Sequence, residues 1–302
     1  MKRWILAVAL LVLSVVLSVG SVRADYTYTT VDPPGSVGTY LMGINNAGRI
    51  VGSYFDSSGA THSFVYDGST YTTIDDPNAY QTSDDPYTYA DGISNNGQIV
   101  GSYIALNASS NAEVSQGFLY KGSTYADISY PGASDTIACG VDNSGQIVGY
   151  YYVGSPATPH AFLYDGSTYR NLDYAGASLT QVFGINDEGQ IVGDYCKGTG
   201  PCVGFVYNGS TYTILSSGYV YSGINNRGQT VGTYSSGNPT DNTYATHGFV
   251  YNGWTYTTIS DPNACVGGKF CGTNVLGIND AGQVVGSFTD NNRLTHGFIA
   301  TP

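Results

Sequence analysis

Histidine is the first residue type in this sequence that could carry chemistry, because an imidazole can transfer protons and bind metal ions near neutral pH. Each histidine lies two residues before a phenylalanine in a recurring pattern: His62, His160, His247 and His296. A residue that recurs with a repeat serves the structure of the repeat, so we expect each imidazole to bond a neighbouring backbone group or hydroxyl. No His-x-x-x-His or Cys-x-x-Cys spacing is present, and we predict neither a metal site nor a cofactor.

Carboxylates are the second candidates, since glycoside hydrolysis uses a pair of them at a fixed separation. Glutamate occurs only at Glu113 and Glu188, whereas aspartate is plentiful, so an aspartate pair stays open. The richest local combination is YQTSDDPYTYAD, residues 80–91, although an ordinary polar loop with strand tyrosines is the alternative. Its candidate ligand-binding residues are Asp84, Asp85, Tyr87 and Asp91.

Arginine is too scarce for a sialidase, whose site gathers three arginines around a carboxylate. After residue 24 the chain has only four: Arg49, Arg170, Arg227 and Arg293. Two of them fall in short Asn/Asp-x-Gly turns, which lack the tryptophan of sialidase Asp-box turns. The same turns lack the alternating acidic oxygens of a calcium loop. We interpret them as hairpin turns in which glycine supplies a positive φ.

Cysteine spacing predicts two local disulfides. Cys196 and Cys202 bracket one five-residue loop, and Cys265 and Cys271 bracket another. Each pair can staple its own loop in an oxidising compartment. Cys139 is left over, and we expect it to be a free thiol buried as a small apolar residue.

Residues 1–24 have the composition of a secretory signal peptide. Lys2 and Arg3 precede an apolar run over 4–19, and small residues lead to a cleavage site after Ala24. The run is long for such a segment, so an uncleaved membrane anchor is the alternative. We predict a soluble protein exported to the extracellular space or periplasm, with one domain over residues 25–302.

Beyond residue 24 the chain has 7 basic and 22 acidic residues, a net charge of −15. Such a surface repels nucleic acid and anionic membranes, so we expect neither as a partner. Only 11% of the residues are charged, against about 25% in an ordinary domain. Together with 41 glycines and 28 tyrosines, this indicates β-structure covered on both faces.

A repeat organises the chain. The string GINNAGRIVG begins at Gly43, and its counterparts begin at Gly92, Gly140, Gly184, Gly223 and Gly277. A second block of the type HAFLYDGSTY follows each copy, except that the last one stops at HGFIATP. At His160-Ala161-Phe162 the pattern resembles the bacterial extracellular HAF-repeat family. The resemblance covers nearly all of the chain after residue 24 and implies a secreted repeat protein, but it supplies no activity or catalytic residue. Gln116 and Val203 replace the histidine in two copies.

Each copy reads as four short antiparallel strands, and Asp-Gly or Asn-Gly between the third and fourth is a strong hairpin signal. Four strands per 39–54 residues predict an all-β fold, a six-bladed β-propeller. A linear β-solenoid is the competitor. The last copy lacks a fourth strand, and YTYTTVDPPG at the start has the sequence of one. We therefore predict that the N-terminal strand completes the last blade and closes the ring.

The two ends of such a ring differ, because the turns after the first and third strands are nearly invariant and the other loops vary. Variable loops on a rigid scaffold are where binding usually resides. We predict a secreted, monomeric, non-enzymatic propeller that binds an extracellular glycan or protein through its variable loops, with glycan as the first expectation. The alternatives are a glycan-cleaving hydrolase or lyase that uses an aspartate pair on the same face, and a structural protein of the envelope or matrix.

Overall fold

The computed structural model describes residues 26–82, 85–107, 111–154, 157–237, 244–268 and 270–302. The predicted signal peptide, residues 1–24, and the candidate Asp84 lie outside the described residues. Within these ranges every regular element is a β-strand. No helix that could span a membrane occurs in this part of the chain.

The strands pair antiparallel in successive sets that follow the sequence repeat. The first set contains β2 (Gly38–Ile44), β3 (Ile50–Phe55), β4 (Thr61–Tyr66) and β5 (Tyr71–Thr73). The second contains β8 (Thr88–Ile93), β9 (Ile99–Leu106), β10 (Glu113–Lys121) and β11 (Thr124–Ile128). Between these two sets lies a small hairpin of β6 (Gln81–Thr82) and β7 (Asp85–Pro86). The third contains β12 (Asp135–Val141), β13 (Ile147–Gly154), β14 (Ala157–Tyr164) and β15 (Tyr169–Asn171).

The remaining sets repeat this order. The fourth contains β16 (Leu179–Ile185), β17 (Ile191–Cys196), β18 (Val203–Tyr207) and β19 (Tyr212–Ser217). The fifth contains β20 (Tyr219–Ile224), β21 (Thr230–Ser236), β22 (Ala245–Tyr251) and β23 (Tyr256–Ile259). The last contains β24 (Gly272–Ile278), β25 (Val284–Thr289), β26 (Thr295–Thr301) and β1 (Thr27–Thr30).

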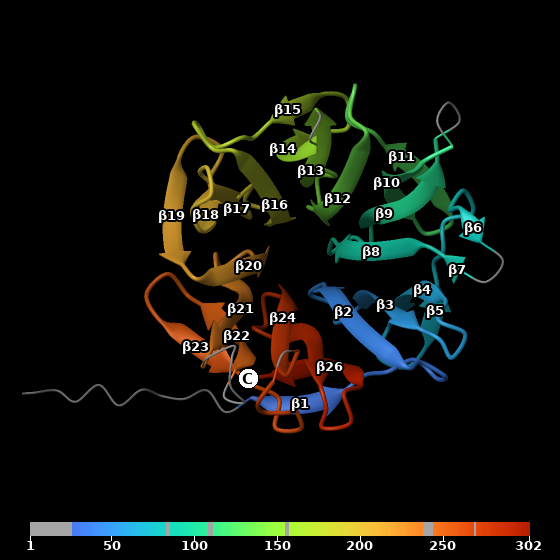
Figure 1. Cartoon of the computed structure of the whole chain (residues 1–302), viewed down its shortest axis with the longest axis vertical. Coiled ribbons are helices and arrows are strands. Elements are labelled where there is room, and N and C mark those ends of the chain that lie inside the picture. Colours follow the sequence, from blue (N-terminus) through green and yellow to red (C-terminus); the bar gives the residue numbers. More distant parts are fainter. Residues whose placement is uncertain (1–25, 83–84, 108–110, 155–156, 238–243, 269) are drawn as a thin grey trace, which may run out of the picture.

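The N-terminal strand β1 lies beside the C-terminal strand β26 (Figure 1). Their register runs from Thr27 opposite Thr301 to Thr30 opposite Phe298. The backbone N–H of Val31 continues the contact by donating to the carbonyl of Gly297, 2.9 Å away. This pairing confirms the strand partnership that the incomplete last repeat predicts.

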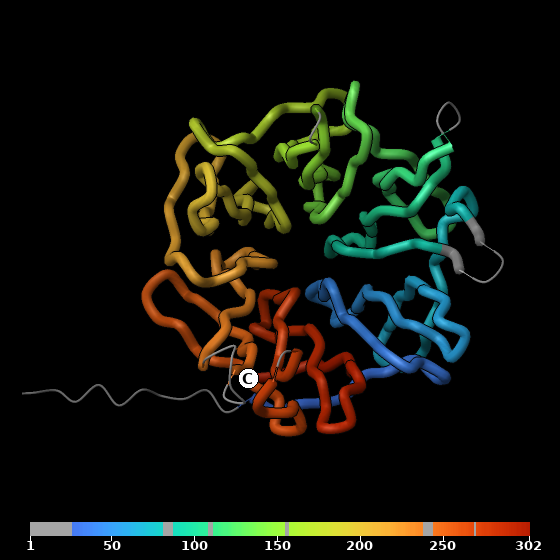
Figure 2. Tube along the Cα trace, in the orientation of Figure 1, coloured from blue at the N-terminus to red at the C-terminus, as the bar shows by residue number. Residues whose placement is uncertain are grey.

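The sets are arranged around a common axis, and the first strand of each lies innermost (Figure 1). Figure 2 shows the same course along the chain trace. The innermost backbones approach one another at the glycine that begins each repeat. A Cβ on Gly140 would lie 3.0 Å from the Cα of Gly184, and one on Gly277 would lie 3.1 Å from the Cα of Gly43. Glycine is therefore needed at these contacts because a side chain would separate neighbouring sets.

A β-bulge in each first strand explains the glycine of the Gln-Ile-Val-Gly motif. In the second set, the pairing of β8 with β9 skips Asp91, between Ala90 and Gly92. Close to this bulge, a Cβ on Gly101 would overlap the carbonyl oxygen of Tyr89. The same steric relation recurs at Gly52, Gly149, Gly193, Gly232 and Gly286.

An asparagine that directly precedes the Asn/Asp-x-Gly triplet, such as Asn186 before Asp187, bonds both its own turn and the neighbouring set. The Oδ1 atom of Asn186 accepts the backbone N–H of Gln190, while its Nδ2 donates to the carbonyl of Asn225 in the next set, 2.9 Å away. Asn225 donates in the same way to Asn279, and Asn279 donates to Asn45. These asparagines therefore hold adjacent sets together in addition to forming their own turns.

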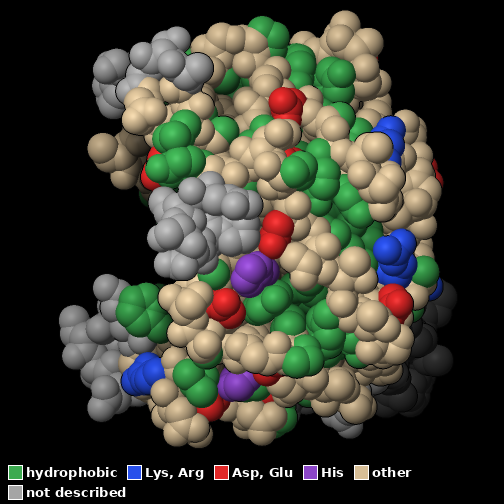
Figure 3. All heavy atoms as spheres, turned by 90° about the vertical axis from the view of Figure 1, so that its right-hand side faces the viewer, with side chains coloured by type: hydrophobic (Ala, Val, Ile, Leu, Met, Phe, Trp, Pro, Cys, Tyr) green, Lys and Arg blue, Asp and Glu red, His purple; other side chains and the backbone are tan. Residues whose placement is uncertain are grey.

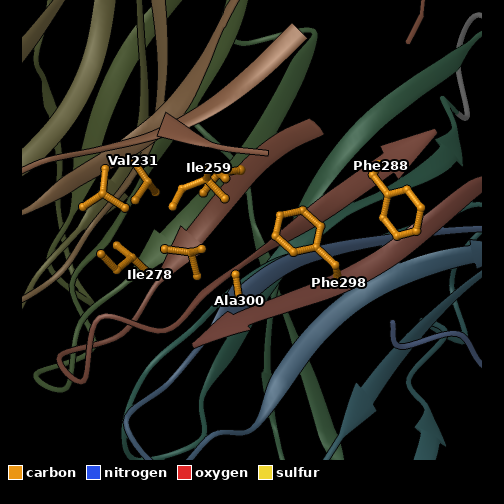
Figure 4. Packing of buried hydrophobic residues seen from close by; sticks show 9 residues of the cluster. Val231, Ile259, Ile278, Phe288, Phe298 and Ala300 are labelled. Atoms are coloured by element: carbon orange, nitrogen blue, oxygen red, sulfur yellow. The ribbon is translucent and has the colours of Figure 1, made fainter. Parts of the chain in front are cut away.

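The core fills the space between sets with apolar side chains from both. In one cluster, Phe298 and Ala300 of β26 pack with residues of neighbouring strands such as Val231 and Ile278 (Figure 4). The phenylalanine of the His-x-Phe motif is buried in every set: Phe64, Phe118, Phe162, Phe205, Phe249 and Phe298. Sheets with both faces covered are what the low content of charged residues predicts.

Candidate ligand-binding groove

A groove of about 860 Å³ opens at the end of the molecule that carries the variable loops. We call it the Arg293 groove, and it draws residues from the first, fifth and last strand sets: Tyr40, Tyr244, Thr246, Phe270, Asn274, Ser287, Thr289, Arg293 and Thr295. The first and last sets meet here because Gly38 of β2 pairs in parallel with Thr295 of β26. Residues more than 200 positions apart in the sequence therefore share one wall.

Polar side chains of the last set line one side of the groove. Asn274 of β24 lies opposite Ser287 of β25, and Thr289 lies opposite Thr295 of β26. Ser287 and Thr289 are two residues apart on one strand, so their side chains point to the same face of the sheet. The result is a row of hydroxyl and amide groups.

Aromatic rings border this row. The Tyr40 ring meets the edge of Phe55, with ring centroids 6.1 Å apart and an interplanar angle of 89°. The hydroxyl of Tyr244 donates to Oγ of Ser235 over 2.9 Å. Phe270 is 76% exposed, so a large apolar surface faces solvent at the groove. Rings that are held in place beside open polar groups favour ligands with both an apolar face and hydroxyls.

The loop that carries Phe270 is held from two sides. The Cys265–Cys271 disulfide closes it, and the N–H of Cys265 donates to the carbonyl of Thr289 over 2.7 Å. Both the N–H and the hydroxyl of Thr246 donate to the carbonyl of Cys271, at 3.0 and 3.1 Å. A loop anchored in this way loses less conformational entropy when it binds a ligand.

Arg293 is the charged residue of the groove lining. Oδ1 of Asp290 accepts the N–H groups of Asn292 and Leu294 at 2.8 and 2.9 Å, which fixes the turn around Arg293. These hydrogen bonds hold the pKa of Asp290 below its usual value. The guanidinium donates to Sγ of Cys271 over 3.1 Å, so its position is tied to the stapled loop.

Backbone strain is concentrated at this groove. Among the described residues, the non-glycine residues with positive φ are Asn111, Phe270 at 81° and Arg293 at 69°. Bulky side chains adopt this conformation only at a cost, and such residues cluster at functional sites. Two of the three line the Arg293 groove.

The stretch singled out in the sequence does not form one compact site in the described residues. Asp85 lies in β7, and the carbonyl of Tyr87 accepts the N–H of Ile104 before β8 begins. Asp91 is four residues farther along, roughly 13 Å at the usual rise of a strand, and its side chain lines a cavity on the axis. None of the candidates in this stretch is among the residues that line the Arg293 groove.

No local sequence signal joins the residues of the groove. The loop 260–274 stands out by its length and cysteine pair, but Tyr40, Thr246 and Thr295 lie in strands whose sequences resemble those of other repeats. Only their adjacency in space distinguishes them.

Both predicted disulfides, Cys196–Cys202 and Cys265–Cys271, are present. Cys139 is a free thiol, as predicted. Its predicted burial holds in part, because the side chain is half-buried and lines the cavity on the axis. Cys139 occupies the bulge position of β12, which pairing with β13 skips, so it turns away from the packed interior of the sheet.

The histidines have structural partners, and three of the four bond a carboxylate, which the expectation of a backbone group or hydroxyl did not include. His160 has the expected hydroxyl partner as well, since its Nε2 lies 3.2 Å from Oγ1 of Thr158. Nδ1 of His160 lies 2.7 Å from Oδ2 of Asp173, whose Oδ1 accepts the N–H of Ala161. His62 pairs in the same way with Asp75, and His296 with Asp32. On the face shown in Figure 3, histidine side chains lie beside acidic ones. The sequence contains a signal for these carboxylate partners, since an aspartate follows the fourth strand of each of these repeats.

His247 differs because Ser260 stands where the other sets have the aspartate, and its Nδ1 lies 3.1 Å from Oγ of that serine. Burial lowers the pKa of the His247 imidazole. In the part of the chain that the structure describes, no group of three or more His, Cys, Asp or Glu side chains could hold a metal ion.

No protein-family model and no curated protein sequence matches the chain. Similar solved structures include the sialidase of Trypanosoma rangeli in complex with sialic acid, with a TM-score of 0.50, 12% identity and 92% of this chain aligned to 57% of that one. The fucose-specific lectin from Aleuria aurantia has a TM-score of 0.48 and 14% identity over 89% of this chain and 93% of that one. The β-propeller domain of the trilobed protease from Pyrococcus furiosus has a TM-score of 0.44 and 9% identity over 87% and 95%.

At these identities a likeness bears on the fold alone. The chain spans little more than half of the Trypanosoma rangeli sialidase. Antiparallel strand sets around a common axis, together with this likeness, define the protein as an all-β propeller.

Proposed function

We propose that the protein is a secreted, monomeric, non-enzymatic propeller that binds an extracellular glycan in the Arg293 groove. The groove itself carries the proposal: aromatic rings for the apolar faces of sugars stand beside a row of hydroxyl and amide groups and one guanidinium. Its stapled loop and its two strained residues support a preformed site. The disulfides are consistent with an oxidising compartment after cleavage of residues 1–24.

The proposal includes a closed ring of six blades. It is supported by the pairing of β1 with β26, by the approach of Gly277 to Gly43, and by the hydrogen bond from Asn279 to Asn45. Closure matters for the function because it brings Tyr40 of the first strand set to the residues of the last one.

A glycan array probed with the purified protein tests the proposal. We expect at least one glycan to bind, and we expect Tyr40→Ala and Arg293→Ala to weaken its binding at least tenfold. Trp254→Ala and Arg227→Ala are matched controls, since they remove an aromatic ring and a guanidinium from the opposite, invariant end. Trp254 is 91% exposed, so its loss should not disturb the fold. Loss of binding in the controls alone, or no bound glycan at all, would contradict the proposal.

The candidates Asp84, Asp85 and Tyr87 are tested in the same experiment. Their replacement by alanine should weaken binding if the ligand extends over the loop 80–91. Wild-type binding in these three variants, with loss in Tyr40→Ala, would restrict the site to the groove. Size-exclusion chromatography of the same samples tests the monomeric state.

A further inference from the structure

The axis of the propeller contains a cavity that the proposed glycan site does not use. Its volume is about 270 Å³, which lies below the range of about 300–1,000 Å³ for drug-sized ligands. Toward the invariant turns the channel narrows to spaces of about 80 and 60 Å³. Ile137 and Val220 lie at the other rim, two residues nearer the variable loops than the bulged residues. The cavity therefore opens at the variable end.

The wall of the cavity is formed by the bulged residue of each first strand. Strand pairing skips these residues in every set, so their side chains turn toward the axis. They are Met42, Asp91, Cys139, Phe183, Ser222 and Leu276. Although the Gly-Ile-Asn and Gln-Ile-Val-Gly motifs that follow are nearly invariant, this position holds six different residue types.

Most of this wall is apolar or aromatic. Phe183 and the Tyr150 ring meet edge to face, with centroids 6.4 Å apart, and the fully buried Tyr221 adds a third ring. Aromatic faces attract organic cations, more strongly when water is excluded. Because these rings and apolar side chains surround the cavity, they would cover the apolar part of a small ligand on several sides.

Asp91 is the one carboxylate in this wall. Protein atoms surround it, yet no hydrogen bond from the described residues reaches its side-chain oxygens, which remain partly open to the channel. Its neighbours offer no positive charge, since Cys139 and Tyr150 are the titratable side chains beside it. Buried carboxylates are normally paired, and an unpaired one in a cavity is a candidate for binding a ligand. Burial raises the pKa of this carboxyl to about 7.

We propose that the axial cavity binds a small organic amine, with its ammonium group against Asp91 and its apolar body among Phe183, Tyr150 and Leu276. The ammonium supplies the charge and the hydrogen-bond donors that the protein leaves out at Asp91. The net charge of −15 beyond residue 24 steers cations toward the molecule. This inference does not rest on the proposed glycan site.

Calorimetric titration of the full chain with benzylamine at pH 8 tests the proposal, because this probe combines one ammonium with one ring. Benzyl alcohol and benzoate are the neutral and anionic comparisons. We expect benzylamine to bind, benzyl alcohol to bind at least tenfold more weakly, and benzoate not to bind. Asp91→Asn should weaken benzylamine at least tenfold and leave benzyl alcohol unchanged. Asp76→Asn is the matched control, since Asp76 is also a buried carboxyl with a raised pKa but does not line the cavity.

Alkylation of Cys139 places the ligand independently of the variants. This free thiol lines the same cavity, so bound benzylamine should slow its reaction with a small neutral reagent at least fivefold, and benzoate should not. The proposal is overturned if benzylamine fails to bind, binds without protecting Cys139, or binds Asp91→Asn as tightly as the wild type. Equal affinity for benzyl alcohol and benzylamine would also overturn it.

Discussion

Nδ2 of Asn279 donates a hydrogen bond to the backbone carbonyl of Asn45, 3.2 Å away, across 234 positions of sequence. Asn186 makes the equivalent bond to Asn225 between two strand sets that are consecutive in the chain, at 2.9 Å. Within their own turns the two asparagines have the same partners, because each accepts a backbone N–H from the glutamine four residues on and donates to its side chain. The two sites differ only in which interface they fasten.

This equivalence gives a test of ring closure. Asn279→Ala and Asn186→Ala should each lower the free energy of unfolding by about 1–3 kcal/mol, since each leaves a buried carbonyl without its donor. Urea denaturation followed by circular dichroism measures both. If the ring were open in solution, Asn279→Ala would lose only its turn contacts and would be clearly less damaging than Asn186→Ala.

The N-terminal strand gives a second test. Deleting residues 25–36 removes β1, the buried Val31 and the Asp32 carboxylate that bonds His296. The edge of β26 is then exposed, which favours aggregation. For a chain of about this size, each kcal/mol of lost stability lowers the melting temperature by roughly 2–4 °C. Because the deletion removes several contacts at once, we expect the melting temperature to fall by at least about 10 °C. A deletion variant that melts with the intact protein would disprove the closing role of β1.

The strand partnership of β1 could be predicted because it follows from counting: the last repeat lacks one strand and the chain begins with one. The Arg293 groove could not, because Tyr40, Phe270 and Thr295 gain their common role from adjacency between the ends of the chain. Similarly, the alternation of a strand predicts which face a residue takes, but the bulge at Asp91 and Cys139 breaks that alternation. The sequence shows the repeated glycine of the Gln-Ile-Val-Gly motif on the neighbouring strand, but only the backbone shows the bulge that makes this glycine necessary.

The glycine of the Gln-Ile-Val-Gly motif is open to a direct test within one strand set. A Cβ on Gly193 would overlap the carbonyl oxygen of Gln181, whereas one on Gly184 would lie 3.4 Å from its nearest neighbour, an ordinary contact. Gly193→Ala should therefore destabilise the protein by about 1–3 kcal/mol through forced backbone shifts. Gly184→Ala should change stability by less than about 1 kcal/mol, because the lower entropy of the unfolded chain offsets small adjustments. Chemical denaturation measures the free energy of unfolding of both variants. Equal decreases in the two would contradict the steric explanation.

The axial carboxyl makes stability depend on pH in a defined direction. Burial raises the pKa of Asp91 from 3.8 to about 7, so the folded protein holds this proton more tightly than the unfolded chain does. The stability linked to Asp91 is complete below pH 3.8 and is lost as the pH rises toward 7. Cys139 and Tyr150 stay neutral over this range, because burial raises the pKa of both groups.

Asp91→Asn should consequently be more stable than the wild type at pH 8 and equal to it near pH 3.5. Because one pKa unit corresponds to about 1.4 kcal/mol and the side chain is partly hydrated, we expect a gain of roughly 1–3 kcal/mol at pH 8. Asp165→Asn is the control of opposite sign: hydrogen bonds from Thr168 and Ser167 lower the pKa of this exposed carboxyl, so its replacement should lower the melting temperature at pH 8. Thermal melts of the three proteins from pH 3.5 to 8 provide the comparison. A difference between Asp91→Asn and the wild type that does not change with pH would show that the carboxyl is as well stabilised in the channel as in water.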